Sequence, residues 1–418
     1  MSQANPTKPK PKVNSNHPFV ALQPPTASAL RLQSEDEAIE IARKLADQFL
    51  AGAAERDREG YLPIDEINAY SQSGLWGLTV PKEYGGLGAS YSTVAWVSSI
   101  IAAADSSIAQ IAHNHLTLVA HIALDGTEAQ KQELFGLVLN GWRFGNAFSE
   151  LHSKNVAAFE TRFIDDGNDV IVNGEKFYTT GALLAHIVPI VAVNEQGQAA
   201  LIFADRDAPG LTVTNNWSSF GQRTTASGSV KIENVRVSKQ RVIIIEAFHD
   251  HTAAGAISQI IQASIDAGIA RQSIDETIHF VKNQSRPWLD SDKPTAAEDV
   301  FTIHAIGDLK IKLHAAEALL ERAGHLIDKA VASPNAQTVA VATTATSEAK
   351  VLTTNIAIEA TNRLFELAGT RSTLQQHNLD RYWRNARVHT LHDPVRWKYF
   401  HIGNYYLNGI RPPRNAWN

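Results

Sequence analysis

The chain has 418 residues, of which 44% are hydrophobic and 19% charged, and its formal net charge is −5. This composition is typical of globular proteins, and the length predicts two or three packed domains. The small acidic charge excludes no fold, but it gives no reason to expect nucleic acid or an anionic membrane as a partner. The N-terminus is polar and proline-rich, without the apolar segment of a signal peptide, and no apolar run approaches the roughly 20 residues that cross a bilayer. We therefore expect a cytoplasmic protein.

Sulfur is almost absent from the sequence. There is no Cys, and Met1 is the single Met. Disulfides, thiolate zinc sites and Cys nucleophiles are thereby excluded. Two explanations stay open at this point: compositional drift, or selection against sulfur in a protein that is made when sulfur is scarce.

The first part of the chain predicts a flexible tail followed by a helical domain. Residues 1–33 are rich in proline and show little periodicity. Ser34 is followed three residues later by Glu37, which is the pattern of a capping box at a helix start. Over residues 34–140 the apolar spacing then predicts helices at 34–56, 64–73, 90–104, 106–124 and 127–139.

Over residues 141–246 the sequence pattern changes to that of a β domain. Short β-branched runs are separated by Asp-Gly, Asn-Gly, Pro-Gly and Ser-Gly turns, and they read DVIVNG, HIVPIVAV, AALIFA, GLTVT and GSVKIENVRV. Residues 247–418 return to long helical patterns, predicted at 250–283, 297–331, 336–368, 376–390 and 393–408. Helices, strands and again helices predict an α+β fold whose C-terminal part is a four-helix bundle.

Four motifs follow one another in the first half of the chain. They are GLWGLTVPKEYGGLG at 74–88, GNAFSE at 145–150, NGEKFYTTG at 173–181 and FGQRTTASGS at 220–229. Their order and spacing resemble the acyl-CoA dehydrogenase family over roughly residues 34–400. The resemblance implies a helical N-terminal domain, a middle β-barrel-like domain and a C-terminal four-helix bundle.

Five segments are similar to one branch of that family, the flavin monooxygenases of sulfur compounds of the dibenzothiophene monooxygenase type. They read SSIAQIAHNHL, RFGNAFSE, KFYTTGA, SFGQRTTASGSV and NLDRYWRNARVHTLHDP. The resemblance implies a two-component enzyme in sulfur acquisition. It would take reduced FMN from a separate NAD(P)H:flavin reductase and oxidise a small organosulfur compound with O₂ through a C4a-hydroperoxyflavin. An FAD-dependent acyl-CoA dehydrogenase is the alternative. No G-x-G-x-x-G follows a predicted strand, so we do not expect the chain to reduce its own flavin with NADH.

The segment around His392 distinguishes the two activities. A dehydrogenase needs a carboxylate base, which the family usually supplies as a Glu at a position that here falls on Asp393. Asp393 is one methylene shorter and precedes Pro394, and the alternative base region 257–262 has no carboxylate. The resemblance to the monooxygenases implies that His392 is catalytic instead. A local structural role for His392 and a base role for Asp393 remain as alternatives.

The same resemblance assigns the remaining candidate site residues. Asn146 and Thr180 are expected to face the isoalloxazine ring and take part in catalysis, with turn chemistry as the alternative. Trp217 is expected to form a wall beside flavin or substrate, with an ordinary core position as its alternative, and His113 to line the substrate cavity. The polar residues of the fourth motif are expected near the flavin phosphate or ribityl chain, and they are Gln222, Arg223, Ser227 and Ser229.

Two arginines are the candidates for phosphate binding. Arg286 and Arg371 match positions that reach the cofactor of a neighbouring subunit in the family, and the alternative for each is a surface cation at a helix end. If these positions hold, the cofactor site is shared between subunits, and the resemblance then implies a homotetramer. We expect no metal, because the spacing of His113, His115 and His121 does not place them on one helical face.

Overall fold

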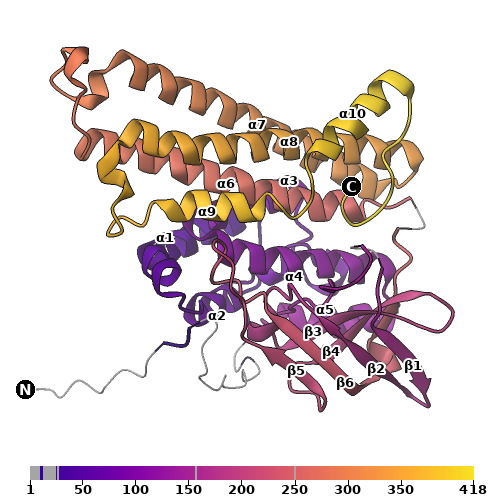
Figure 1. Cartoon of the computed structure of the whole chain (residues 1–418). Coiled ribbons are helices and arrows are strands. Elements are labelled where there is room, and N and C mark those ends of the chain that lie inside the picture. Colours follow the sequence, from indigo (N-terminus) through magenta and orange to yellow (C-terminus); the bar gives the residue numbers. More distant parts are fainter. Residues whose placement is uncertain (1–9, 13–24, 26–27, 156–157, 249–250) are drawn as a thin grey trace, which may run out of the picture.

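The computed structural model describes residues 10–12, 25, 28–155, 158–248 and 251–418. A first group of helices and the β-sheet lie on one side of the molecule, and the long C-terminal helices lie across them (Figure 1). The predicted α+β layout is confirmed. The predicted domain boundaries at 140/141 and 246/247 stay predictions.

The described residues of the N-terminal part form five α-helices. They are α1 (Glu35–Glu59), α2 (Ile64–Gln72), α3 (Tyr91–Ala104), α4 (Ser106–Asp125) and α5 (Glu128–Leu139). The Ser34 hydroxyl accepts from the Glu37 backbone N–H, as predicted for the start of α1, but the Glu37 carboxylate accepts from the N–H of Gln33 rather than from Ser34. The predicted capping box is therefore half formed.

The described parts of the predicted tail contact this helical block. Lys12 forms an isolated bridge with Tyr61, and the Leu30 N–H donates to the carbonyl of Gln72. Ordered chain thus begins before α1. The rest of the prediction for residues 1–33 lies outside the described residues.

The helix α4 lies between the long C-terminal helices and the sheet (Figure 1). Almost all of its residues are buried, because neighbouring elements cover it on several sides. Asp105 caps its first turn by accepting from the N–H groups of Ser107 and Ile108, and Arg56 of α1 donates to the Asp105 carboxylate at 2.9 Å. A polar side chain on α4 is therefore held in the interior of the protein.

The β domain is one seven-stranded sheet with the linear order β5-β6-β2-β1-β3-β4-β7. The strands are β1 (Arg162–Asp166), β2 (Asp169–Lys176), β3 (Ile187–Val193), β4 (Ala199–Asp205), β5 (Leu211–Thr214), β6 (Ser229–Ser238) and β7 (Val242–Ile244). All neighbours are antiparallel except β1 and β3. The sequence did not predict β1 and β7, because β1 buries a single side chain, Phe163, and β7 has three residues.

In the C-terminal part, the residues that the structure describes form three long helices and two short ones. They are α6 (Ala254–Asn283), α7 (Val300–Ala332), α8 (Ala336–Ala368), α9 (Asp380–His389) and α10 (Arg396–Asn408). The buried surface of α6 packs against α8 and also against α3. The contact with α3 joins the N-terminal block to the C-terminal bundle. None of the helices in the described ranges combines the length and apolar character needed to cross a membrane.

Candidate functional site

Polar side chains of α4 and α9 meet in the interior below α6. From α4 come Gln110, His113 and Asn114, which lie within five residues of one another and are all buried. From the end of α9 and the turn that follows come His389 and His392. Such a concentration of polar groups inside an apolar core is costly unless the groups bond one another or a ligand.

Three of these polar groups and Asp266 of α6 form one hydrogen-bonded chain. Asp266 of α6 lies 2.5 Å from His389 Nδ1, and His389 Nε2 lies 2.9 Å from Gln110 Oε1. Gln110 Nε2 lies 3.0 Å from His392 Nε2, and His392 Nδ1 donates to the His389 carbonyl at 2.6 Å. The chain runs from a carboxylate with no solvent contact to a ring that remains exposed in the single subunit.

The surroundings of His392 favour its neutral form. Desolvation, followed by the nearby His389, lowers its pKa to about 4. Solvent reaches the outer edge of the ring, which weakens this shift until the edge is covered. The structure thus places the predicted catalytic histidine at an accessible edge, with both ring nitrogens already bonded to protein.

Asp393 points away from this edge and is buried. Its Oδ2 lies 3.5 Å from Lys398 Nζ, and its Oδ1 lies 3.9 Å from Lys350 Nζ. Both carboxylate oxygens thus face lysine side chains in the interior, and Asp393 itself is only 4% exposed. The geometry therefore disfavours the role that a dehydrogenase would require of Asp393.

His113 faces the same interior region. Its Nε2 bonds Ser258 of α6 at 3.1 Å, and its Nδ1 has no hydrogen-bond partner among the described residues. Desolvation and the neighbouring His392, His389 and Lys350 hold the pKa of His113 well below its usual range. A neutral imidazole with one free nitrogen suits a position beside an uncharged substrate.

Asn146 and Thr180 lie next to each other, since the Asn146 N–H donates to the Thr180 carbonyl at 3.2 Å. Asn114 Nδ2 donates to the Gln110 carbonyl, so its Oδ1 accepts from Asn146 Nδ2 at 2.8 Å. The Asn146 Oδ1 is then left buried, with no hydrogen-bond partner in the part of the chain that the structure describes. Asn146 therefore presents an acceptor.

Thr180 also presents an acceptor. Thr225 donates to the Gln222 carbonyl at 3.0 Å, so Ser227 must donate to Thr225, and Thr180 must donate to Ser227, both at 2.7 Å. Each hydroxyl has a single proton, so the remaining capacity of the Thr180 hydroxyl is its lone pairs. Any group bonded by both Asn146 and Thr180 has to carry N–H or O–H donors.

The loop after β5 supplies Trp217 and Gln222. Trp217 is half-buried, packs edge to face on Tyr178, and donates from Nε1 to the Gln222 carbonyl at 2.9 Å. The buried side-chain amide of Gln222 has no hydrogen-bond partner among the described residues. Tyr178, Gln222 and Ala226 all have positive φ. Strained backbone of this kind persists where the surroundings impose it, often at functional sites.

Arg286 and Arg371 meet at the far end of α6. Arg371 donates to the carbonyl of Gln284, and both arginines are exposed. The 17 helical steps from Asp266 to Asn283 span about 25 Å of helix. Neither guanidinium is therefore part of the polar chain in its own subunit.

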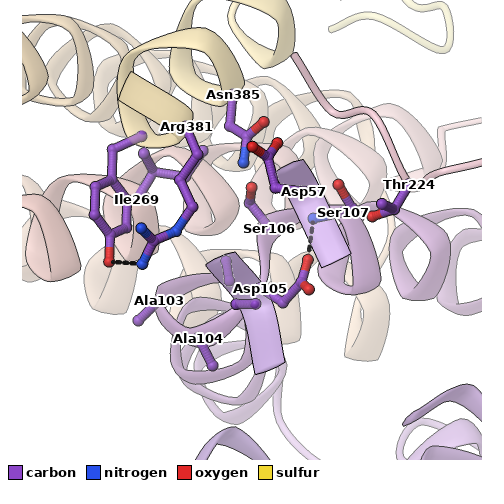
Figure 2. A pocket seen from close by; sticks show the side chains of 13 residues that line it. Asp57, Ala103, Ala104, Asp105, Ser106, Ser107, Thr224, Ile269, Arg381 and Asn385 are labelled. Carbon is purple, nitrogen blue, oxygen red and sulfur yellow. Dashed lines mark hydrogen bonds between the residues drawn. The ribbon is translucent and has the colours of Figure 1, made fainter. Parts of the chain in front are cut away.

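A separate pocket adjoins the polar chain (Figure 2). It lies between Asp57 of α1, the start of α4 at Ser106 and Ser107, and Arg381 and Asn385 of α9. Gln110 lies one helical turn further along α4, and His389 one turn further along α9. None of the predicted site residues lines this pocket.

The other histidines of α4 have structural contacts. His115 accepts from the Phe144 N–H and donates to the Trp76 carbonyl, and desolvation lowers its pKa to about 3. His121 pairs with Asp125. No group of three or more His, Cys, Asp or Glu side chains with metal-binding geometry occurs in the part of the chain that the structure describes.

Comparisons with known proteins identify the family of this chain. Models of the acyl-CoA dehydrogenase N-terminal, middle and C-terminal domains match residues 33–141, 148–235 and 260–397. A dibenzothiophene monooxygenase of Rhodococcus erythropolis is 34% identical over 398 residues, which cover 91% of this chain and 95% of that protein. This chain belongs to the acyl-CoA dehydrogenase family.

Two further relatives of this family member are monooxygenases. The probable FMNH₂-dependent monooxygenase SfnC of Pseudomonas putida is 32% identical, covering 90% of this chain and 96% of that protein. The crystal structure of FMN-bound TdsC from Paenibacillus sp. A11-2 has a TM-score of 0.87 and 30% identity, over 91% of this chain and all of the other. The predicted resemblance to the family and to its sulfur-compound monooxygenases is confirmed.

The buried acceptors of this family member fit a flavin. Buried polar atoms are almost always bonded in a working protein, so the unpartnered Asn146 Oδ1 and Gln222 amide indicate a polar group that binds against them. The edge of an isoalloxazine ring carries an N–H group at N3, and the reduced ring carries a further one at N5. The predicted pair Asn146 and Thr180 is brought together as such a site requires.

The sequence analysis missed Gln110, His389 and Asp266, which connect to His392. A signal for Asp266 was present, because Ser258, Gln262 and Asp266 recur every four residues on a largely apolar part of α6. His389 likewise precedes His392 by three residues. Polar residues at helical spacing within an apolar helix indicate a buried polar contact.

Proposed function

We propose that this protein is the oxygenase component of a two-component monooxygenase. It binds FMNH₂ supplied by a separate NAD(P)H:flavin reductase and oxidises a small organosulfur compound of the dibenzothiophene or sulfone type. The reduced flavin supplies two electrons, so that one atom of O₂ enters the sulfur compound and the other leaves as water. FAD is the less favoured cofactor, since TdsC binds FMN.

The observation that carries this proposal is the pair of acceptors at Asn146 and Thr180. An N–H at flavin N5 exists in the reduced ring and is lost on oxidation, so two acceptors at this position favour the reduced cofactor. An enzyme that receives its flavin already reduced needs this preference. The names of the dibenzothiophene and FMNH₂-dependent relatives support the same function.

The other site residues have complementary roles in this proposal. His392 holds or moves a proton at the accessible edge of the polar chain. The half-buried Trp217 packs beside the flavin ring. His113, uncharged and with a free Nδ1, lines the substrate side. These roles would place an apolar substrate between α4 and the loop that carries Trp217, and oxygenation there requires that water be kept out.

The position of the two arginines supports a shared site and a homotetramer. Arg286 and Arg371 are exposed about 25 Å along α6 from Asp266, so they are free to bind the flavin phosphate of a neighbouring subunit. Exposed apolar side chains surround the same end of α6 and the start of α7, and they include Trp288, Leu289 and Phe301. Such a surface is typical of subunit contacts. A cytoplasmic location, where NAD(P)H is present, is part of the proposal.

The test is reconstitution with a flavin reductase, NADH, O₂ and a panel of thiophenes, sulfones and sulfonates. We expect a sulfur-oxygenated product from the wild-type protein and at least a 100-fold slower rate in His392→Ala. His279→Ala, which changes a histidine on the exposed surface of α6, serves as the matched control and should keep full activity. Reduction of bound flavin by an acyl-CoA in the absence of O₂ would instead establish a dehydrogenase.

The biological part of the proposal is a role in sulfur acquisition. A chain whose only sulfur atom is in Met1 costs little sulfur to make, which suits a protein needed when sulfate is scarce. We expect its abundance in the producing cell to rise when sulfate is removed. If the abundance does not depend on sulfate supply, compositional drift would be the explanation for the almost sulfur-free sequence.

A further inference from the structure

The two ring nitrogens of His392 are both engaged in this arrangement. Nδ1 lies 2.6 Å from the His389 carbonyl, which can only accept, so Nδ1 carries a proton. A neutral His392 then has a lone pair at Nε2, and this lone pair must accept from Gln110 Nε2 at 3.0 Å. His392 is therefore in its Nδ1–H form, with no proton at Nε2.

The orientation of the Gln110 amide follows from the same requirement. With the amide reversed, its oxygen would face His392 Nε2, and His392 would need a proton on both nitrogens. Desolvation of the inner edge of the ring and the neighbouring His389 disfavour that cation, since they lower the pKa of His392. Gln110 thus presents its NH₂ to His392 and its Oε1 to His389.

The same reasoning places a second proton on His389. Its Nε2 faces the Gln110 oxygen at 2.9 Å and its Nδ1 faces the Asp266 carboxylate at 2.5 Å, so both nitrogens must donate. Asp266 is ionised, because Lys350 and His389 lower its pKa to about 2 although burial opposes this. His389 and Asp266 form an ion pair that has no contact with solvent.

Charged and titratable groups surround the chain from every element packed against it. On α4 there is His113, on α8 Lys350, and beyond α9 there are Asp393 and, on α10, Lys398. Burial lowers the pKa of Lys398 to about 8. Lys350 lies 3.4 Å from Asp266 and is the nearest of these groups to the ion pair.

We propose that Gln110 is a positioning residue that couples the protonation of His392 to that of His389. The side chains from Asp266 to His392 together hold one proton more than they would with Asp266 ionised and both histidines neutral. In the resting arrangement this proton is on His389, and His392 accepts at Nε2. Rotation of the Gln110 amide by half a turn exchanges its donor and acceptor ends, which requires His389 to lose a proton and His392 to gain one.

This arrangement stores a proton in the interior and delivers it to an accessible edge. No bond between heavy atoms changes: one N–H bond is lost at His389 and one is formed at His392 Nε2, so the charge of the chain is conserved. The use of this proton in oxygen transfer rests on the proposed function. The arrangement itself is a property of the chain without cofactor, and it is tested on that chain.

The test is nitrogen NMR of the histidine side chains in the cofactor-free protein at pH 7. We expect His392 to be neutral with its proton at Nδ1, and His389 to be protonated at both nitrogens, in signals assigned by single His→Gln variants. Finding His392 with its proton at Nε2 would overturn the proposal. This measurement on the wild-type protein decides even where a variant of Gln110 fails to fold.

Two variants and a control then distinguish a positioning role of Gln110 from a packing role. Gln110→Glu puts a carboxylate between the rings, to which both can donate, so the titration midpoint of His392 should rise by about 1–3 pH units. Asp266→Asn should remove the doubly protonated signal of His389. Gln262→Glu adds the same charge at a buried position of α6 that bonds neither histidine, and should leave the His392 proton at Nδ1. An unchanged His392 in Gln110→Glu would contradict the coupling.

Discussion

Gly145 and Ala182 are in backbone contact. A methyl group on Gly145 would lie 2.5 Å from the Cα of Ala182 and 2.9 Å from the carbonyl carbon of Gly181. This approach brings the segment of Asn146 against the segment of Thr180, so the geometry of the acceptor pair depends on a residue without a side chain.

Gly145→Ala should therefore separate the two acceptors. We expect a loss of about 1–3 kcal/mol in the free energy of unfolding, because backbone atoms cannot yield as a flexible side chain would. FMN affinity should fall with it. The matched control is Gly136→Ala in α5, where a methyl group meets nothing within 4 Å and should stabilise the helix slightly. Urea unfolding and flavin titration measure both effects.

The hydroxyl groups of Thr180, Ser227 and Thr225 form a chain in which each donates to the next, starting from Thr180. This direction gives a prediction on the redox preference of the flavin site. Thr180→Val removes an acceptor for N–H at the reduced flavin, so binding of reduced FMN should weaken up to about tenfold relative to oxidised FMN. Thr179→Val is the control, since the Thr179 hydroxyl donates to the Gly228 carbonyl and is not part of the hydroxyl chain. The midpoint potential of bound flavin should become lower in Thr180→Val alone. Equal potentials in all three proteins would remove Thr180 from the flavin site.

The arginines at the end of α6 give a prediction on phosphate recognition. Arg286→Ala and Arg371→Ala should each weaken FMN binding about 10–100-fold, because a charge-assisted hydrogen bond is lost. Riboflavin, which has no phosphate, should bind these variants and the wild-type protein equally. Arg363→Ala removes an exposed arginine that pairs with Glu366 on α8, and should not change either affinity. A parallel loss of riboflavin affinity would mean that the arginines act through folding or assembly.

The buried His115 gives a prediction on pH-dependent stability. Its folded pKa of about 3 lies below the usual value of 6.5, so between these values the unfolded chain binds a proton that the folded chain does not. The contribution of His115 to stability is thus complete above pH 6.5 and is lost as the pH falls, by about 1.4 kcal/mol per pH unit. His115→Gln should show a shallower decline between pH 6 and pH 4.5 in urea unfolding. An identical slope would mean that His115 is charged in the folded protein.

Local sequence determined most of the helices and the order of the three parts. The apolar spacing of 336–368 and the cap at Asn335 define α8 with bounds that match the prediction, because a helix is specified by contacts within a few residues. The motifs that contain Asn146, Thr180 and His392 could likewise be recognised from residue types in order. The sulfur-free composition and the absence of a carboxylate at 257–262 are also properties of the sequence alone.

The tertiary structure decided what these residues can do. Gln110 and His392 are 282 positions apart, and only the packing of α4 against α6 and α9 places their side chains 3.0 Å from each other. Which nitrogen carries a proton, which amide end faces a ring, and that Asp393 turns toward two lysines all follow from partners distant in sequence. Hydrogen bonds and electrostatic interactions act through space, so residue types along the chain cannot specify them until the core has formed.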